Sequence, residues 1–198
     1  MRRILIAALL GAVAMFAWTS ISHMVLPLGT IGIKEIPNEA PALSALNSSI
    51  GTANGLYLYP GMGLGDNPSM QQMRDAMPAY EKKLASSPSG ILIYHPPGPP
   101  KAMGPLLGIE FGKEFFLVLF TALLLSMTRL EGYGSKVGFF AVVGIVATMT
   151  TNVSYWNWYG FPTNYTLAYM FVDFMAFLAA GLAVAAVMKK GTTMAAAA

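Results

Sequence analysis

Four ionisable side chains stand in stretches of the chain that are otherwise apolar. Asp173 lies inside the apolar run at residues 165–188, about 12 Å from its first residue if the run is helical. A carboxylate at that depth in a membrane helix is costly unless it is paired, protonated or in contact with water. Glu110, Lys113 and Glu114 precede another apolar run, and at helical spacing they lie close to one another.

These four residues can be combined in two ways. A salt bridge between Asp173 and Lys113 would fix one helix against another. Alternatively, three acids beside one base carry surplus negative charge, which favours protonation of one acid or attracts a cation. The first arrangement predicts a structural lock and the second predicts proton or cation handling. Both stay open at the level of the sequence.

The composition indicates what surrounds these residues. Of the 198 residues, 55% are hydrophobic and 11% are charged, and the mean hydropathy is +0.55. Because a soluble domain carries about a quarter of charged residues, these values predict an integral membrane protein. The predicted transmembrane helices are residues 1–26, 106–128, 137–156 and 165–188.

Two of these spans need an argument. The first follows a basic start, as a signal peptide does, but its apolar run of about 22 residues is long for one, so we expect an uncleaved helix. The second is apolar only over residues 115–127 and reaches the ~20 residues that a bilayer needs only when it is extended upstream. That extension brings Glu110, Lys113 and Glu114 into or near the outer leaflet.

Basic residues between and beyond the spans predict the orientation. If all four runs cross, one side of the membrane carries Arg2, Arg3, Arg129, Lys136, Lys189 and Lys190. The positive-inside rule makes this side cytoplasmic, so both termini are inside and residues 27–105 are extracytoplasmic. We expect a multi-pass protein of the cell membrane, in a bacterium the inner membrane.

Residues 27–105 are long enough for a small α/β domain. Strands are predicted at residues 31–36, 56–59 and 91–95, alternating with two helices, one capped by Asn38 and the other capped at Asp66-Asn67 with Pro68 at its first position. The second helix has a stripe that includes Met70, Met73 and Met77, and Pro78 should kink or split it. The proline-rich residues 96–100 predict a stiff tether to the membrane, and residues 191–198 a flexible tail.

A rim of aromatic and amide side chains precedes the last span. Its members are Tyr155, Trp156, Asn157, Trp158, Tyr159 and Asn164. Trp and Tyr at this place are typical of the belt at a membrane interface. The belt does not account for the amides, which need hydrogen-bond partners that another protein could supply.

Metal and cofactor chemistry receive little support. His23, Met24 and His95, with the methionine stripe, have the ligand types of a Cu(I) site. The methionines are spaced as in a helix core, however, and Met is an ordinary core residue. The chain has no Cys, which excludes thiolate sites, and its net charge of +3 does not indicate nucleic acid. No cofactor is predicted.

The sequence thus predicts an integral membrane α-helical bundle of four transmembrane helices, with a small α/β extramembrane domain between helices 1 and 2. No catalytic signature is present, so we expect a non-catalytic accessory subunit that contacts lipid and other membrane subunits or copies of itself. One alternative is a small proton- or cation-handling protein centred on Asp173 and the cluster of Glu110, Lys113 and Glu114. A second is extracytoplasmic binding of copper or a small ligand.

Overall fold

A computed structural model describes residues 1–188 of the chain, in two compact units. The helical unit comprises Met1–Ile33 and the residues from Lys101 onward, and the insert unit comprises Lys34–Pro100. Three helices of the helical unit are long and apolar enough to cross a membrane, namely α1 (Arg2–Met24), α5 (Tyr133–Tyr159) and α6 (Thr163–Val187). The predicted tail, with Lys189 and Lys190, lies outside the described residues.

The second predicted span forms α4 (Met103–Ser126), a helix of 24 residues. Its length suffices for a crossing, but it is not among the three helices that are apolar enough by composition. The reason is the group of Glu110, Lys113 and Glu114 in its first half. The mostly helical class is therefore confirmed with three candidate spans, and the four-span bundle is not.

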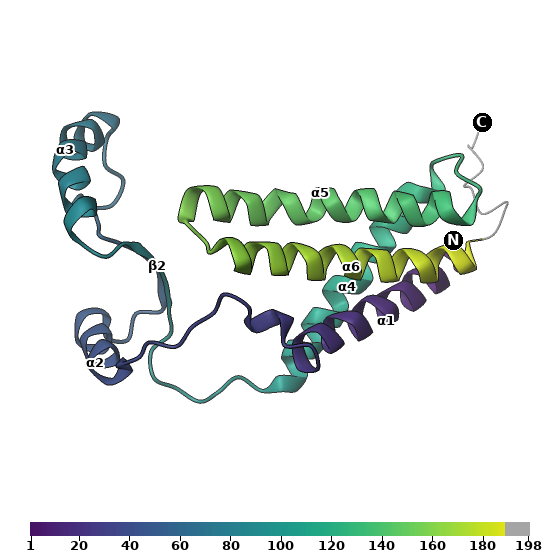
Figure 1. Cartoon of the computed structure of the whole chain (residues 1–198), viewed down its shortest axis with the longest axis horizontal. Helices are drawn as coiled ribbons and strands as arrows, with labels where there is room; N and C mark the ends of the chain where they lie inside the picture. The colour runs from purple at the N-terminus through teal and green to yellow at the C-terminus, as the bar shows by residue number, and fades with distance from the viewer. Residues whose placement is uncertain (189–198) are drawn as a thin grey trace. The chain divides into compact units, whose positions relative to one another are not determined.

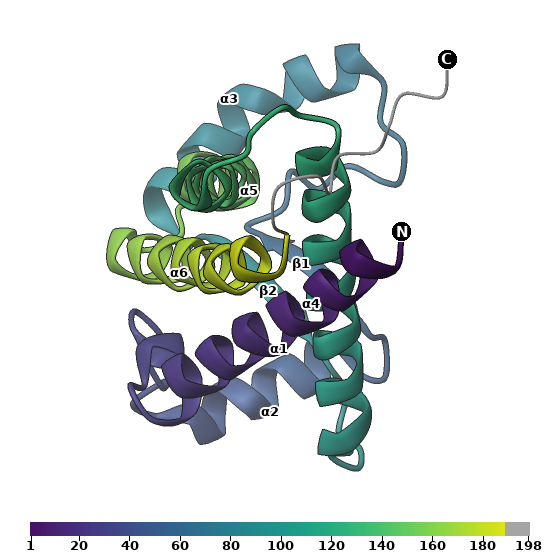
Figure 2. The ribbon, with the colours of Figure 1, turned by 90° about the vertical axis from the view of Figure 1, so that its right-hand side faces the viewer.

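The helices of the helical unit pack in the order α5–α6–α1–α4, and successive long helices run in opposite directions (Figure 1). Helices α4 and α5, at the two ends of this order, hardly contact each other (Figure 2). The buried core residues are Ile4, Ala7, Ala8, Met15, Val118, Ala122, Leu125, Phe140, Ala176, Phe177, Ala180, Val184 and Met188. This core lies mainly where α6 and α4 meet α1 and where α5 meets α6.

Small residues allow the helices to approach closely. A Cβ atom at Gly11 of α1 would lie 2.7 Å from Val118 and 2.8 Å from Val184. A Cβ atom at Gly181 of α6 would lie 2.6 Å from Cβ of Phe140. The backbones can pack at these distances only because the side chains are absent.

The ends of α5 and α6 are fixed to each other. Gly160 has φ of +68° and ends α5, and α6 begins after Pro162. At the opposite end the buried Lys136 donates a hydrogen bond from Nζ to the carbonyl of Met188, and the Tyr133 hydroxyl donates to Leu182 O at 3.1 Å.

The insert unit contains α2 (Glu39–Ile50), β1 (Gly55–Tyr59), α3 (Met70–Ser86) and β2 (Gly90–Tyr94). The strands pair antiparallel, with Leu56 opposite Ile93 and Leu58 opposite Ile91. The described chain thus has a sheet of two strands, and the predicted third strand at residues 31–36 is wrong.

Two features replace that third strand. A short 3-10 helix, η1 (Leu28–Thr30), follows α1, and Ile33 N donates to Thr30 O at 3.1 Å in a turn. Gly32 in this turn has φ of +82°, and its Cβ would lie 2.6 Å from Cβ of Tyr165. The chain here packs closely against α6 and has no strand partner.

The predicted start of α3 also needs correction. Ser69 occupies the N-cap and accepts a hydrogen bond from Gln72 N at 3.2 Å, while the Gln72 side chain accepts from Ser69 N at 2.8 Å. This capping box outcompetes the predicted start at Asp66-Asn67-Pro68. Helix α3 runs through Pro78 without being split.

The insert unit has little core. No residue of α2 or α3 is buried, and Met70 of the predicted apolar stripe is 63% exposed. Tyr94 is buried and its hydroxyl donates to Gly51 O at 2.9 Å. A unit of this size with so few buried side chains is marginal alone.

Candidate functional site

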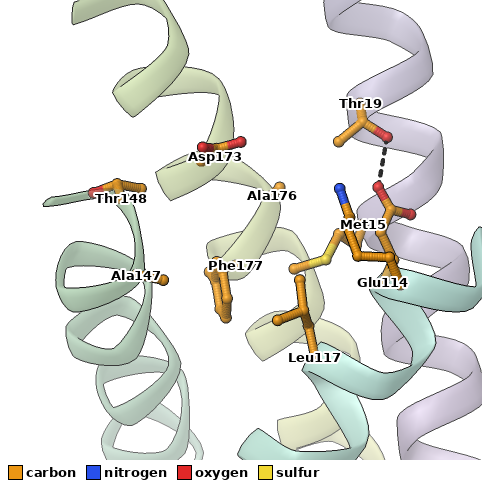
Figure 3. A pocket seen from close by; sticks show the side chains of 10 residues that line it. Met15, Thr19, Glu114, Leu117, Ala147, Thr148, Asp173, Ala176 and Phe177 are labelled. Carbon is orange, nitrogen blue, oxygen red and sulfur yellow. Dashed lines mark hydrogen bonds between the residues drawn. The ribbon is translucent and has the colours of Figure 1, made fainter. Parts of the chain in front are cut away.

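A polar layer crosses the helical unit at one level, made of Thr19, Glu114, Thr148 and Asp173 (Figure 3). These residues come one each from α1, α4, α5 and α6, towards the end where α1 and α5 finish and α4 and α6 begin. All four line one cavity of about 230 Å³. The other lining residues are Met15, Lys113, Leu117, Ala147, Ala176 and Phe177.

Glu114 is the most enclosed member of the polar layer, with 1% of its surface exposed. Its Oε1 lies 2.9 Å from the hydroxyl oxygen of Thr19. Its Oε2 is buried and has no hydrogen-bond partner within the described part of the chain. An acid that is buried with a free oxygen is unusual, because such groups are nearly always satisfied.

Lys113 does not form the predicted lock with Asp173. Its Nζ lies 2.5 Å from Oε1 of Glu110, and the two side chains are 52% and 44% exposed. Glu110 is one turn away on the same helix, whereas Asp173 is on α6, which α4 hardly contacts. The local partner therefore holds the lysine, although Lys113 still lines the cavity.

Asp173 is half-buried and faces the cavity from the side opposite Glu114 (Figure 3). Lys113 and the amide of Asn152 on α5 are near enough to interact with its carboxylate. The Asn152 Nδ2 also donates to Thr148 O at 2.9 Å, within α5 and beside the polar layer. Asp173 is therefore partly satisfied by polar contacts, and the described residues do not place it in an ion pair.

Thr19 and Thr148 were not predicted as members of this site. A threonine in an apolar helix is common, and its hydroxyl usually bonds a backbone carbonyl in the preceding turn. Thr148 lies about as far from the end of α5 as Glu114 and Asp173 lie from the starts of α4 and α6, but Thr19 lies closer to the end of α1. Only the packing of the helices shows that Thr19 and Thr148 line the same cavity as the two acids.

The predicted rim residues all lie on the surface, as Trp158 shows with 79% exposure. Trp156 Nε1 donates to Thr163 Oγ1 at 3.1 Å, which joins α5 to α6. Beside it, Tyr155 stacks on Phe161 with ring centroids 5.3 Å apart. The full set is Tyr155, Trp156, Asn157, Trp158, Tyr159 and Asn164, and the Asn164 Oδ1 accepts from Tyr165 N at 3.0 Å.

The candidate copper ligands are divided between the two units. His23 and Met24 belong to the helical unit, where they line a hollow of about 480 Å³ with Glu110, and His95 belongs to the insert unit. The His23 Nδ1 lies 2.9 Å from Thr19 O. Over residues 1–188, no group of three or more His, Asp or Glu side chains that could hold a metal ion is brought together.

No known protein family matches this chain, and neither the curated proteins nor the solved structures contain one significantly similar to it.

Proposed function

We propose that the protein is a non-catalytic integral membrane subunit of a larger assembly. In this proposal α1, α4, α5 and α6 all cross the membrane, and a transmembrane helix of a partner packs between α4 and α5. Lys113 and Asp173 then contact that partner helix. The partner is another membrane protein or a second copy of the chain.

The observation that carries this proposal is the open side of the helical unit. Helices α4 and α5 hardly contact each other, yet the cavity between them is lined by the exposed Lys113 and by the half-buried Asp173. Lipid chains offer no hydrogen bonds to such groups, so leaving them towards lipid is costly. A partner helix would remove them from lipid and supply polar contacts.

The crossing of α4 is supported by its packing. It has 24 residues, and it lies along α1, itself a candidate span. Its charged residues are placed where a membrane can accept them, because Glu114 is buried against α1 and Lys113 pairs with Glu110. Ion pairing and burial within a bundle are the usual ways in which intramembrane charges are accommodated.

The proposed orientation follows from the ends of the helices. Arg2, Arg3 and Arg129 lie at one end of the helical unit, and the aromatic rim lies at the other (Figure 1). The positive-inside rule then makes the first end cytoplasmic. The insert unit, which connects α1 to α4, is on the extracytoplasmic side, where it supplies a second contact surface.

Site-specific photo-crosslinking tests the partner helix. A photoreactive residue at Ala147, which lines the cavity, should give protein adducts in native membranes. The same residue at Val146, its neighbour on α5 with 61% exposure, should give lipid adducts. Equal adducts from both positions, or a lone monomer in native mass spectrometry after gentle extraction, would refute the proposal.

A second candidate function is the handling of protons or small cations. The observation that favours it is the cavity, which Asp173 enters without an ion pair to Lys113. The test is ion flux into liposomes that contain the purified protein. Flux that Asp173→Asn abolishes would support this function, and flux that is absent or unchanged by the substitution would rule it out.

A further inference from the structure

The hydroxyl of Thr19 stands between two oxygen atoms. Its Oγ1 lies 3.1 Å from the backbone carbonyl of Phe16, in the preceding turn of α1, and 2.9 Å from Oε1 of Glu114. Both distances are those of hydrogen bonds. A threonine hydroxyl has one proton to donate, however, and a carbonyl oxygen has none.

The protonation state of Glu114 decides whether both contacts are hydrogen bonds. If Glu114 is a carboxylate, the single Thr19 proton serves one contact, and the other pair of oxygens is left without a proton. If Glu114 carries a proton on Oε1, it donates to Thr19 Oγ1, and Thr19 donates to Phe16 O. Every close oxygen pair then contains one proton, because a hydroxyl accepts and donates at once.

The second oxygen of Glu114 leads to the same assignment. Oε2 is buried without a partner among the described residues. In a carboxylate, this atom would carry part of a charge, and burying an unpaired charge costs far more than burying a neutral polar group. In a protonated acid, Oε2 is a neutral carbonyl oxygen.

The nearest cation, Lys113, offsets a charge on Glu114 only in part, because Glu110 already pairs with it. Lys113, the next residue on α4, is held by Glu110 at 2.5 Å. From α6 the facing ionisable group is Asp173, which is an acid, and α5 contributes the neutral Thr148. Helix α1 contributes Thr19, with His23 one turn beyond it bound to Thr19 O at 2.9 Å.

We infer that Glu114 holds a proton inside the helical unit and exchanges it with Asp173 through the cavity. Figure 3 shows the two acids on opposite sides of that cavity. Its volume of about 230 Å³ has room for several water molecules. In the exchange, the O–H bond of Glu114 breaks, water carries the proton, and a new O–H bond forms on the Asp173 carboxylate. The negative charge moves from Asp173 to Glu114, so the layer keeps its total charge.

Infrared spectroscopy of the full chain in lipid bilayers tests the proton on Glu114. A protonated carboxylic acid has a C=O stretching band that a carboxylate lacks. The wild type should show this band at neutral pH, Glu114→Gln should lose it, and Glu81→Gln, at an exposed position of α3, should keep it. Absence of the band in the wild type, or its survival in Glu114→Gln, would overturn the inference.

Three further measurements do not depend on the folding of the Glu114 variant. Transfer of the wild type into D₂O should shift the band, whereas a band that stays unshifted would exclude exchange through the cavity. A hydrophobic carbodiimide, which reacts with protonated acids, should modify Glu114 in the wild type, as located by peptide mass spectrometry. In Thr19→Val, which removes the hydrogen-bond acceptor, the band should move; an unmoved band would contradict the proposed geometry.

Discussion

The contact between Gly181 of α6 and Phe140 of α5 gives a direct test of the helix packing. We predict that Gly181→Ala destabilises the helical unit. The added Cβ would lie 2.6 Å from Cβ and 3.1 Å from Cγ of Phe140. Phe140 is fully buried, so it has no free space into which to move.

The magnitude follows from two opposing effects. Overpacking of a well-packed core costs about 1–3 kcal/mol, while replacing Gly by Ala in a helix contributes about 1 kcal/mol of stability. The net loss for Gly181→Ala is therefore about 0–2 kcal/mol. A loss of ~1.4 kcal/mol corresponds to a tenfold change in the unfolding equilibrium.

The matched control is Gly138→Ala on α5. A Cβ at Gly138 would meet nothing within 4 Å, so only the helix propensity changes and stability should stay equal or rise. Unfolding of both variants by SDS in mixed micelles, followed by circular dichroism, gives the comparison. If Gly181→Ala proves as stable as Gly138→Ala, the close approach of α5 and α6 at this point is wrong.

Three other substitutions test single contacts. Lys136→Met removes the buried donor to the carbonyl at the end of α6 and should cost about 1–3 kcal/mol in the same SDS titration. Ser69→Ala removes the N-cap of α3 and should cost about 1 kcal/mol, seen as faster hydrogen exchange in its first turn, which Ser87→Ala at the other end should not show. Tyr94→Phe removes the hydroxyl bond of the insert unit and should cost about 0.5–1.5 kcal/mol, measured as faster exchange of the amides in β1 and β2.

The long helices were predictable because length and apolar composition are local properties. Their ends were less so: α5 extends to Tyr159, beyond the predicted residue 156, because Gly160 in the left-handed conformation ends it and hydropathy does not. The predicted strand at residues 31–36 failed for a nonlocal reason. A strand needs a partner, and the close approach of Gly32 to Tyr165 cannot be read from alternation in the sequence.

The site was predictable in part for similar reasons. An acid such as Glu114 or Asp173 in an apolar stretch is visible in any sequence, because a charge there needs an explanation. The partner of such an acid is not visible. Lys113 could have reached Glu110 or Asp173 by spacing alone, and Thr19 became relevant only when α1 was placed beside α4.

The packing order also has a consequence for how the chain is made. Helix α1 emerges first from the ribosome, but its contact with α6 joins residues far apart, as the bond from Trp18 Nε1 to Val172 O spans 154 positions. At synthesis rates of about 5–20 residues per second, α1 waits on the order of 10–30 s for this neighbour. In the proposed membrane topology, the first helix then lies in the bilayer without α6 during that interval, and a membrane insertase or chaperone has time to bind it. Helices α5 and α6, in contrast, can insert together as a hairpin.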